Sequence, residues 1–360
     1  MDTRVLEFRR VPVEQIEWDF RLTDFSLGPP PVSLARSIRE IGITHPLVLV
    51  PRGGVFGVAA GHRRARLARA SNYSEVPAWV LGAGTETATL LKINLAENAS
   101  HREFSDVEKG TVLRRALEAG LSEERTVAEI MPLAGLERSK KLYVDFLKAG
   151  GLPDGLRSLL HDSNVPLRVF SVFFQWDAES LAAAEKLFSA LRPGNAPERT
   201  GQAQTAHDDA YSPSKPSQLG PAARWPGINK WRELLELLHE IARRDGLRPA
   251  DLLRGREIQS VLESDGAAAG EKYDRILHTV RQWRYPALSE LKQRVLLALD
   301  RLRLDEKIRV RTSESFENGE IKIEIRFLAQ KELVALAEQL AKASASAPMA
   351  DLIKIFRELE

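Results

Sequence analysis

The sequence predicts an α+β protein, and three features of its pattern indicate this class. Short strand-like runs alternate with amphipathic helical runs before residue 104. From Ser105 the apolar spacing is wholly helical, and near the C-terminus two alternating segments flank Asn318-Gly319, a hairpin signal. The segment between the two helical stretches is rich in proline, glycine and polar residues. We therefore expect four regions, at 1–104, 105–191, 192–227 (a linker) and 228–360.

Composition restricts the chemistry. Among 360 residues, 52 are basic and 50 acidic, so the formal net charge is only +2 and any nucleic-acid surface must be a local patch. There is no cysteine, which excludes disulfides, thiolate zinc sites, iron–sulfur clusters and cysteine nucleophiles. No run reaches the roughly 18 apolar residues that a membrane span needs. We expect a cytoplasmic protein without a membrane partner.

The first region reads as a compact α/β unit, because apolar runs of strand length alternate with helical patterns. The expected strands are 5–16, 47–50, 55–59 and 76–80, and the expected helices are 32–41, one starting at His62, and 86–96.

The second region reads as short helices joined by tight turns. Ser105 with Glu108, and Thr126 with Glu129, have the spacing of capping boxes, and glycines supply the stops. The expected helices lie near 106–119, 127–133 and 137–149. This pattern favours a helix-turn-helix.

Helices are also expected beyond the linker, at 231–243, 249–263, 271–283 and 288–302. The last of these has apolar residues spaced by threes and fours, which could form a seam that pairs two chains. The strands 307–311 and 321–327 and a helix from Lys331 follow.

The segment from Val55 to Ala70 has the composition of a phosphate-binding site. A strand leads to Gly61, and the helix after it carries Arg63 and Arg64 in its first turn. Glycine lets a ligand approach the backbone, the helix N-terminus offers unpaired N–H groups, and the arginines add charged donors. A solvated arginine face is an equal alternative for this segment alone.

Glu97-Asn98 closes a helix of the same region. A carboxylate beside an amide oxygen suits Mg²⁺, which also takes oxygens from phosphates. Considered alone, a polar helix terminus explains the pair equally well.

Four ordered segments together resemble the ParB family. VPVEQIEW from Val11 resembles its opening box, and LARSIREIGITHPLVLVP from Leu34 its helix-to-strand segment. AGHRRARLA from Ala60 is similar to the GERRxRAA box, and ENASHREFSDVEKG from Glu97 to the box written ENxQRxDLxxxE. The resemblance covers about residues 5–120. It implies an N-terminal domain of the ParB/sulfiredoxin fold.

The resemblance also implies a function. The domain would bind CTP and Mg²⁺ and close against its dimer mate as a clamp on DNA, and slow CTP hydrolysis would reopen it. By the same resemblance, a ParA-type ATPase is a partner and the protein is nucleoid-associated. The segment 42–46 would line the pocket, and Glu97 and Asn98 would hold the metal. The implied nucleotide-binding residues are Arg21, Gly42, Ile43, Gly61, His62, Arg63, Arg64, Glu97, Asn98 and Arg102.

Two positions depart from the family pattern. His62 replaces the acidic residue of the GERR box, and we expect a neutral surface histidine whose backbone N–H faces the phosphate. His101 stands where the last box has arginine, with Arg102 one place later.

The expected DNA-reading helix starts at Glu137, and its implied DNA contacts are Arg138, Ser139, Lys140 and Lys141. The motif around it is altered. Pro132 interrupts the first helix, and Met131 and Lys141 replace the expected small and apolar residues. The segment 164–171, where the family has a second DNA contact, is apolar apart from Arg168, so we expect it to pack. A solvated helix surface is the alternative for the basic residues.

The C-terminal stretch from Gly319 to Lys342 resembles the family's dimerisation segment, so we expect a homodimer. Ile321, Ile323, Ile325 and Phe327 would share one face of a strand, and packing within the chain is the alternative.

Two other functions stay open. One is a ParB-like nucleotide switch or adaptor that has lost sequence-specific DNA binding. The other is a nucleotide-dependent small-molecule kinase of the same fold, with Glu97 as base. The sequence contains no GxxxxGK[ST] loop and no HExxH motif, and its histidines lack metal-ligand spacing.

Overall fold

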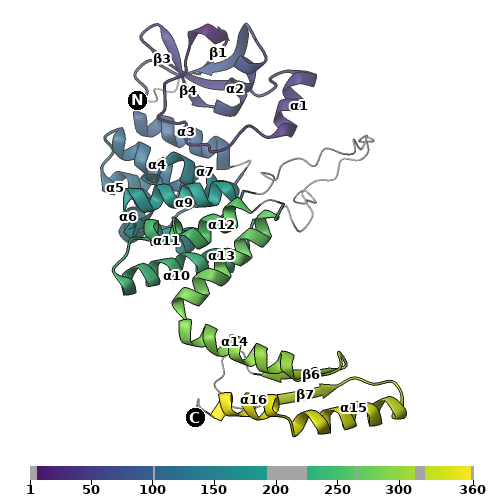
Figure 1. Cartoon of the computed structure of the whole chain (residues 1–360). Helices are drawn as coiled ribbons and strands as arrows, with labels where there is room; N and C mark the ends of the chain where they lie inside the picture. The colour runs from purple at the N-terminus through teal and green to yellow at the C-terminus, as the bar shows by residue number, and fades with distance from the viewer. Residues whose placement is uncertain (1–5, 100–101, 193–224, 265, 313–320, 358–360) are drawn as a thin grey trace. The chain divides into compact units, whose positions relative to one another are not determined.

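The computed structural model describes residues 6–99, 102–192, 225–264, 266–312 and 321–357. Contacts between residues divide the chain into two compact units, Met1–Leu277 and His278–Glu360. Both are drawn in Figure 1. The α+β class expected from the sequence is correct, because a mixed sheet is combined with many helices.

A five-stranded mixed sheet forms the start of the first unit, in the order β1-β5-β3-β4-β2. β3 pairs antiparallel with β4 through the tight turn at Gly53-Gly54, where both residues have positive φ. β1 pairs antiparallel with β5, whereas β3 with β5 and β2 with β4 are parallel. The strands are β1 (Glu7–Pro12), β2 (Ile16–Glu17), β3 (Leu47–Arg52), β4 (Val55–Ala60) and β5 (Glu75–Val80), and a 3₁₀ turn, η1 (Val13–Gln15), separates the first two.

Three helices accompany this sheet (Figure 1): α1 (Val32–Ile41), α2 (His62–Ala70) and α3 (Thr87–Ala99). On α2, Ala65 is buried in one core of the sheet, and on α3, Leu90 is buried in another. Leu91 and Leu95 of α3 pack instead into the core of the following helices. Because α3 contributes to two cores, its sequence is apolar on most sides.

The following helical part is built around the crossing of α4 and α6. A Cβ on Gly150 would lie 2.3 Å from the carbonyl oxygen of Gly110, and a Cβ on Gly110 would lie 2.5 Å from the carbonyl oxygen of Phe146. Only glycine allows two helix backbones to approach so closely. The elements are α4 (Asp106–Glu118), α5 (Glu123–Arg125), a π-helical turn η2 (Thr126–Ile130), α6 (Lys140–Gly150), α7 (Asp154–Asp162), α8 (Leu167–Phe170), η3 (Ser171–Gln175) and α9 (Ala178–Ala190).

One predicted cap is confirmed and one is wrong. Ser105 and Glu108 form the capping box of α4. The next helix starts earlier than expected, because the Ser122 hydroxyl accepts from the backbone N–H of Arg125. Glu129 does not cap it and pairs with Arg125 and with Lys92 of α3 instead.

Residues 228–277 belong to the first unit. Trp231 stacks on Phe188 of α9, with ring centroids 4.0 Å apart. The single helix expected at 249–263 is two helices, which break at Gly255. This part contains α10 (Ile228–Asp245), α11 (Pro249–Leu253), α12 (Arg256–Glu263) and the start of α13 (Ala269–Arg284).

In its described residues, the second unit combines a two-stranded antiparallel sheet with the end of α13 and three further helices. Ile308 pairs with Ile325 in the sheet, and Asn318-Gly319 lies outside the described residues. Val295 and Ala298, from the apolar seam expected to pair two chains, pack against α16 of the same unit. The elements are α14 (Pro286–Arg301), β6 (Ile308–Thr312), β7 (Ile321–Ile325), α15 (Gln330–Ser344) and α16 (Ala347–Arg357).

Candidate functional site

Gly61 forms the junction between β4 and α2. It is the N-cap of α2 with φ +94°, a left-handed conformation that favours glycine. A Cβ there would lie 3.1 Å from a guanidinium nitrogen of Arg64. The first N–H groups of a helix have no partner within it, so this junction can bind an anion.

Arg64 spans the space between α2 and α3. Its Nη1 donates to the carbonyl oxygens of His45, at 2.7 Å, and Pro46, at 3.1 Å. Its Nη2 donates to the Glu97 carboxylate. These hydrogen bonds fix Arg64, the Glu97 carboxylate and the carbonyl groups of His45 and Pro46 relative to one another at one edge of the site.

Arg63 and Arg102 are the other two arginines of the site. Arg63 Nη2 donates to the carbonyl oxygen of Leu27 at 3.3 Å. Burial and the charge of Arg102 lower the pKa of the Arg63 guanidinium, and Glu108 opposes this shift. The Nε atoms of both arginines are buried without a hydrogen-bond partner among the described residues. Both guanidinium groups line the cavity, where their charge favours an anionic ligand.

Helix α3 contributes Asn94, Glu97 and Asn98 to the site. These three residues share one helix face because they are spaced by three and four positions. The buried Asn94 amide donates to the carbonyl oxygens of Thr23, at 3.2 Å, and Ala59, at 2.8 Å. Its own oxygen accepts from Asn98 Nδ2 at 2.8 Å. Asn94 therefore orients Asn98. The sequence reasoning missed Asn94, although its position three residues before Glu97 was an available signal.

These groups line a single cavity of about 450 Å³. It brings together most of the predicted nucleotide-binding residues and adds others, of which His45 lies in the expected segment 42–46. The lining residues are Ser26, Pro31, Leu34, His45, Gly61, His62, Arg63, Arg64, Asn94, Glu97, Asn98 and Arg102. Ser26 and Pro31 belong to none of the four sequence segments, and Leu34 begins the helix-to-strand segment but was not expected to line the pocket.

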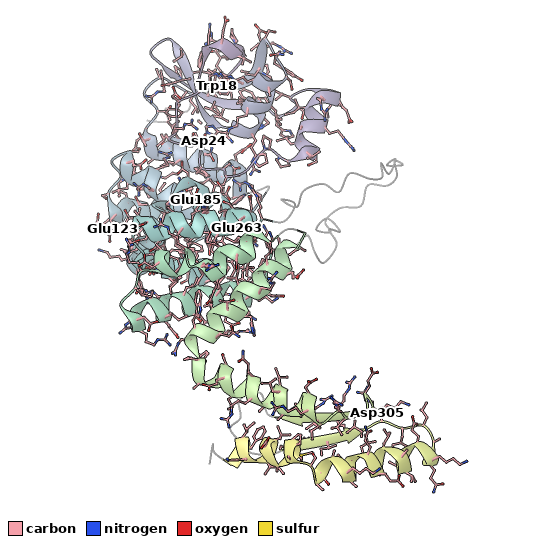
Figure 2. All side chains as sticks on the ribbon, viewed as in Figure 1. Trp18, Asp24, Glu123, Glu185, Glu263 and Asp305 are labelled. Carbon is pink, nitrogen blue, oxygen red and sulfur yellow. The ribbon has the colours of Figure 1, made fainter. Side chains whose placement is uncertain are left out.

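Three predicted residues do not line this cavity. Arg21 Nη1 donates to Asp24 at 3.1 Å and lines a smaller cavity of about 240 Å³. Asp24 is labelled in Figure 2. Gly42 ends α1 with φ +77°, and Ile43 packs against the core that contains Ala65.

His62 is not the surface histidine that was expected. Its Nε2 lies 2.9 Å from the Thr23 hydroxyl, and only 12% of its side chain is exposed. The Thr23 hydroxyl donates to the carbonyl oxygen of Val58, so it accepts from His62, which places the ring proton on Nε2. Burial lowers the pKa of His62 to about 4, against the opposing charge of Asp24. The ring is therefore neutral at pH 7, as expected, but it is a packed part of the site. His101, the other departure, lies outside the described residues.

The donor set fits Mg²⁺ only in part. Glu97 and Asn98 supply a carboxylate and an amide at one wall, which are oxygen ligands that Mg²⁺ accepts. Within the described ranges, no group of three or more acidic, histidine or cysteine side chains could hold a metal ion. An ion here needs phosphate oxygens to complete its coordination.

The expected DNA-reading helix is α6, which starts at Lys140, after Ser139 caps it through the backbone N–H of Leu142. Arg138 and Lys141 are exposed, and Lys140 forms an ion pair with Glu123 at 3.4 Å. Met131 is fully buried in the helical core, so the larger side chain is accommodated there.

The segment 164–171 packs, as the sequence indicated. Val169 and Phe170 are buried, and Arg168 is exposed.

No helix in the described part of the chain is both long and apolar enough to cross a membrane.

Sequence comparisons identify relatives of this chain. Residues 31–99 match the model of the ParB N-terminal domain. The chain is 29% identical over 157 residues to the probable chromosome 1-partitioning protein ParB of Deinococcus radiodurans, covering 43% of this chain and 52% of that protein. It is 36% identical over 97 residues to the chromosome-partitioning protein Spo0J of Thermus thermophilus, covering 27% and 35%. The chain thus spans about half the length, or less, of these curated relatives.

Two solved structures align with half of the chain. The C-terminally truncated chromosome-partitioning protein ParB from Caulobacter crescentus, complexed with CTP-gamma-S, matches at 22% identity and a TM-score of 0.20, covering 50% of this chain and 98% of that one. The Pnob8-like ParB-N domain matches at 14% identity and a TM-score of 0.36, covering 53% and 90%. These TM-scores are too low to support an argument about function.

Proposed function

We propose that this chain, whose residues 31–99 match the ParB N-terminal domain, binds CTP with Mg²⁺ and acts as a DNA-binding clamp in DNA partition or segregation. One observation carries the nucleotide part. The cavity of about 450 Å³ places the Gly61 junction, three arginines and the Glu97-Asn98 pair on its walls.

The arginines are suited to a triphosphate. The N-terminus of α2 supplies backbone N–H donors, and Arg63, Arg64 and Arg102 line the cavity with guanidinium groups. Guanidinium groups bind phosphate through several charge-assisted hydrogen bonds at once. A triphosphate would therefore meet several charged donors at once in this cavity.

Glu97 and Asn98 would hold the Mg²⁺ ion. When bound, the ion would neutralise part of the phosphate charge and orient the triphosphate. The Glu97 carboxylate accepts from Arg64, so the ion would share this carboxylate with Arg64. Mg²⁺ should therefore bind appreciably only together with nucleotide.

The names of the relatives support a partition role, since they are chromosome- and plasmid-partitioning proteins. We propose that Arg138, Ser139, Lys140 and Lys141 contact DNA from the start of α6, which would make the protein nucleoid-associated. A ParA-type ATPase is the partner that this role implies, and hydrolysis of CTP would be slow.

The second unit is the proposed dimerisation element. Ile323 of β7, Phe327 after it, and Val334 of α15 are between 40% and 52% exposed, and Leu328 is 99% exposed. A second copy would cover these apolar groups.

A ligand screen tests the proposal. We expect CTP with Mg²⁺ to raise the melting temperature more than ATP, GTP or the diphosphates, since a ligand that binds only the folded state stabilises it by mass action. Equal shifts for all nucleotides would remove the claim for CTP, and no shift would remove the claim for a nucleotide.

A switch or adaptor without sequence-specific DNA binding is the second candidate. The pairing of Lys140 with Glu123 favours it, because this ion pair removes one positive charge from the surface that DNA would meet. Selection from random DNA separates the two candidates. Enrichment of one palindrome at high salt supports the clamp, and recovery of unrelated sequences that are lost with salt supports the adaptor.

A further inference from the structure

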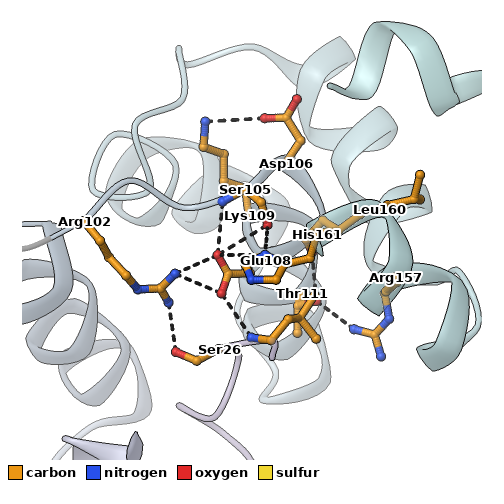
Figure 3. A network of polar contacts seen from close by, with 12 residues as sticks. Ser26, Arg102, Ser105, Asp106, Glu108, Lys109, Thr111, Arg157, Leu160 and His161 are labelled. Carbon is orange, nitrogen blue, oxygen red and sulfur yellow. Dashed lines mark hydrogen bonds and ion pairs between the residues drawn. The ribbon is translucent and has the colours of Figure 1, made fainter. Parts of the chain in front are cut away.

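Glu108 is a fully buried carboxylate that lies behind the nucleotide cavity and does not line it. Its oxygens accept from Arg102 Nη1 at 2.9 and 2.8 Å, from the backbone N–H of Leu27 at 3.0 Å and from the backbone N–H of Ser105 at 3.0 Å. Figure 3 shows the contacts from Arg102 and Ser105 converging on Glu108. A capping box needs only the last of them, so α4 capping alone does not explain this environment.

Arg102 is held on two sides. Its Nη1 binds Glu108, and its Nη2 donates to the Ser26 hydroxyl at 2.8 Å. Both Arg102 and Ser26 line the cavity. The Arg102 guanidinium is therefore fixed in one orientation at the cavity wall.

Arg63 depends on the same carboxylate through the backbone of Leu27. The Leu27 N–H donates to Glu108, and the Leu27 carbonyl oxygen accepts from Arg63 Nη2 at 3.3 Å. One buried carboxylate thus fixes one arginine directly and another through a single residue. It also offsets the repulsion between two neighbouring guanidinium groups.

We propose that Glu108 is a positioning residue of the nucleotide pocket, which orients Arg102 and the Ser26–Leu27 segment for the phosphates without touching the ligand. The inference rests on the proposed nucleotide binding. It adds a residue outside the cavity that sets the affinity for the polyphosphate part of the ligand.

The contacts of Glu108 also reach α7. The Ser105 hydroxyl lies 2.8 Å from Nδ1 of His161, and this Nδ1 is 3.8 Å from the Glu108 carboxylate. A Cβ on Gly28 would lie 3.7 Å from the ring of His161, so the loop after Leu27 also packs there. The Glu108 carboxylate therefore links the cavity wall to α7.

A double-mutant cycle tests the proposal. Dissociation constants for CTP with Mg²⁺ and for inorganic tripolyphosphate are measured for the wild type, Glu108→Gln, Arg102→Ala and the double variant. A glutamine puts an NH₂ group against N–H donors, so we expect Glu108→Gln to weaken both ligands about tenfold. The double variant should match Arg102→Ala within a factor of about two, because groups that act through one another are not additive.

Two further variants keep the test decisive. Glu108→Asp retains the buried charge but withdraws both oxygens, so it should still weaken binding if the glutamine variant does not fold. Glu103→Gln, an exposed carboxylate in the same segment, should bind as the wild type does.

Wild-type binding by Glu108→Asp, or additive losses in the cycle, would overturn the positioning role and leave the proposed nucleotide binding intact. A wild type that binds neither CTP nor tripolyphosphate would overturn both.

Discussion

Arg64 of α2 donates to the carboxylate of Glu97 of α3 across the candidate pocket. The two residues are 33 positions apart in the chain and belong to two different sequence boxes. Their contact brings a basic helix start and an acidic helix end into one site, in which a bound cation would share the Glu97 carboxylate with Arg64.

Replacing Glu97 with glutamine should reduce the dependence of nucleotide binding on Mg²⁺. The amide has no charge, and ligand charge sets the affinity for hard cations, so we expect the Mg²⁺ affinity in the presence of CTP to fall about tenfold or more. Titration of Mg²⁺ at fixed CTP measures this. An unchanged Mg²⁺ titration would show that Glu97 is not a ligand.

Gly61→Ala should impair nucleotide binding as well as stability. An alanine at φ +94° costs about 1–2 kcal/mol, and its Cβ would crowd Arg64. Gly54→Ala is a matched control, because Gly54 has φ +95° and open space around the Cβ position. Both variants should lose similar stability in urea melts, but only Gly61→Ala should bind CTP weakly. Equal CTP binding by the two variants would refute a role of the Gly61 junction in binding phosphate.

The buried His62 predicts a loss of stability in mild acid. Its pKa falls from 6.5 to about 4 on folding, so the unfolded state binds more protons between these values and stability falls as pH decreases through this window. The loss approaches about 3 kcal/mol below pH 4. Urea melts of the wild type and of His62→Gln should diverge between about pH 6.5 and pH 4. Parallel curves would mean that His62 titrates normally.

Gly150→Ala should destabilise the helical part by about 3 kcal/mol or more, because its Cβ would overlap the backbone of Gly110. Gly270→Ala in α13 has open space and should change stability by less than about 1 kcal/mol. Thermal melts compare the two variants. Similar melting temperatures would contradict the close crossing of α4 and α6.

The sequence predicted local features well where the physics is local. A glycine before two arginines specified the α2 start, and Ser105 with Glu108 specified the α4 cap. The predictions from the sequence failed where tertiary contacts determine the structure. Glu129 has capping spacing but pairs with Lys92, a residue that no local pattern connects to it.

The candidate site shows the same difference between local features and features set by tertiary contacts. His62 looked like a surface residue because basic residues surround it in the sequence, whereas the fold buries it against Thr23. Glu108 looked like a simple cap, and its contact with Leu27, 81 residues away, depends on the folded chain. The Asn318-Gly319 hairpin, the four-region division and the roles of individual residues stay predictions.

Calorimetric titration of CTP in the presence of Mg²⁺ tests the central claim most directly. The wild type should bind one CTP per chain, and Arg63→Ala should bind at least about tenfold more weakly, because it removes a charge-assisted donor. Arg10→Ala, an exposed arginine of β1, should match the wild type. No CTP binding by the wild type, or equal binding by Arg63→Ala, would contradict the claim that this pocket is a nucleotide site.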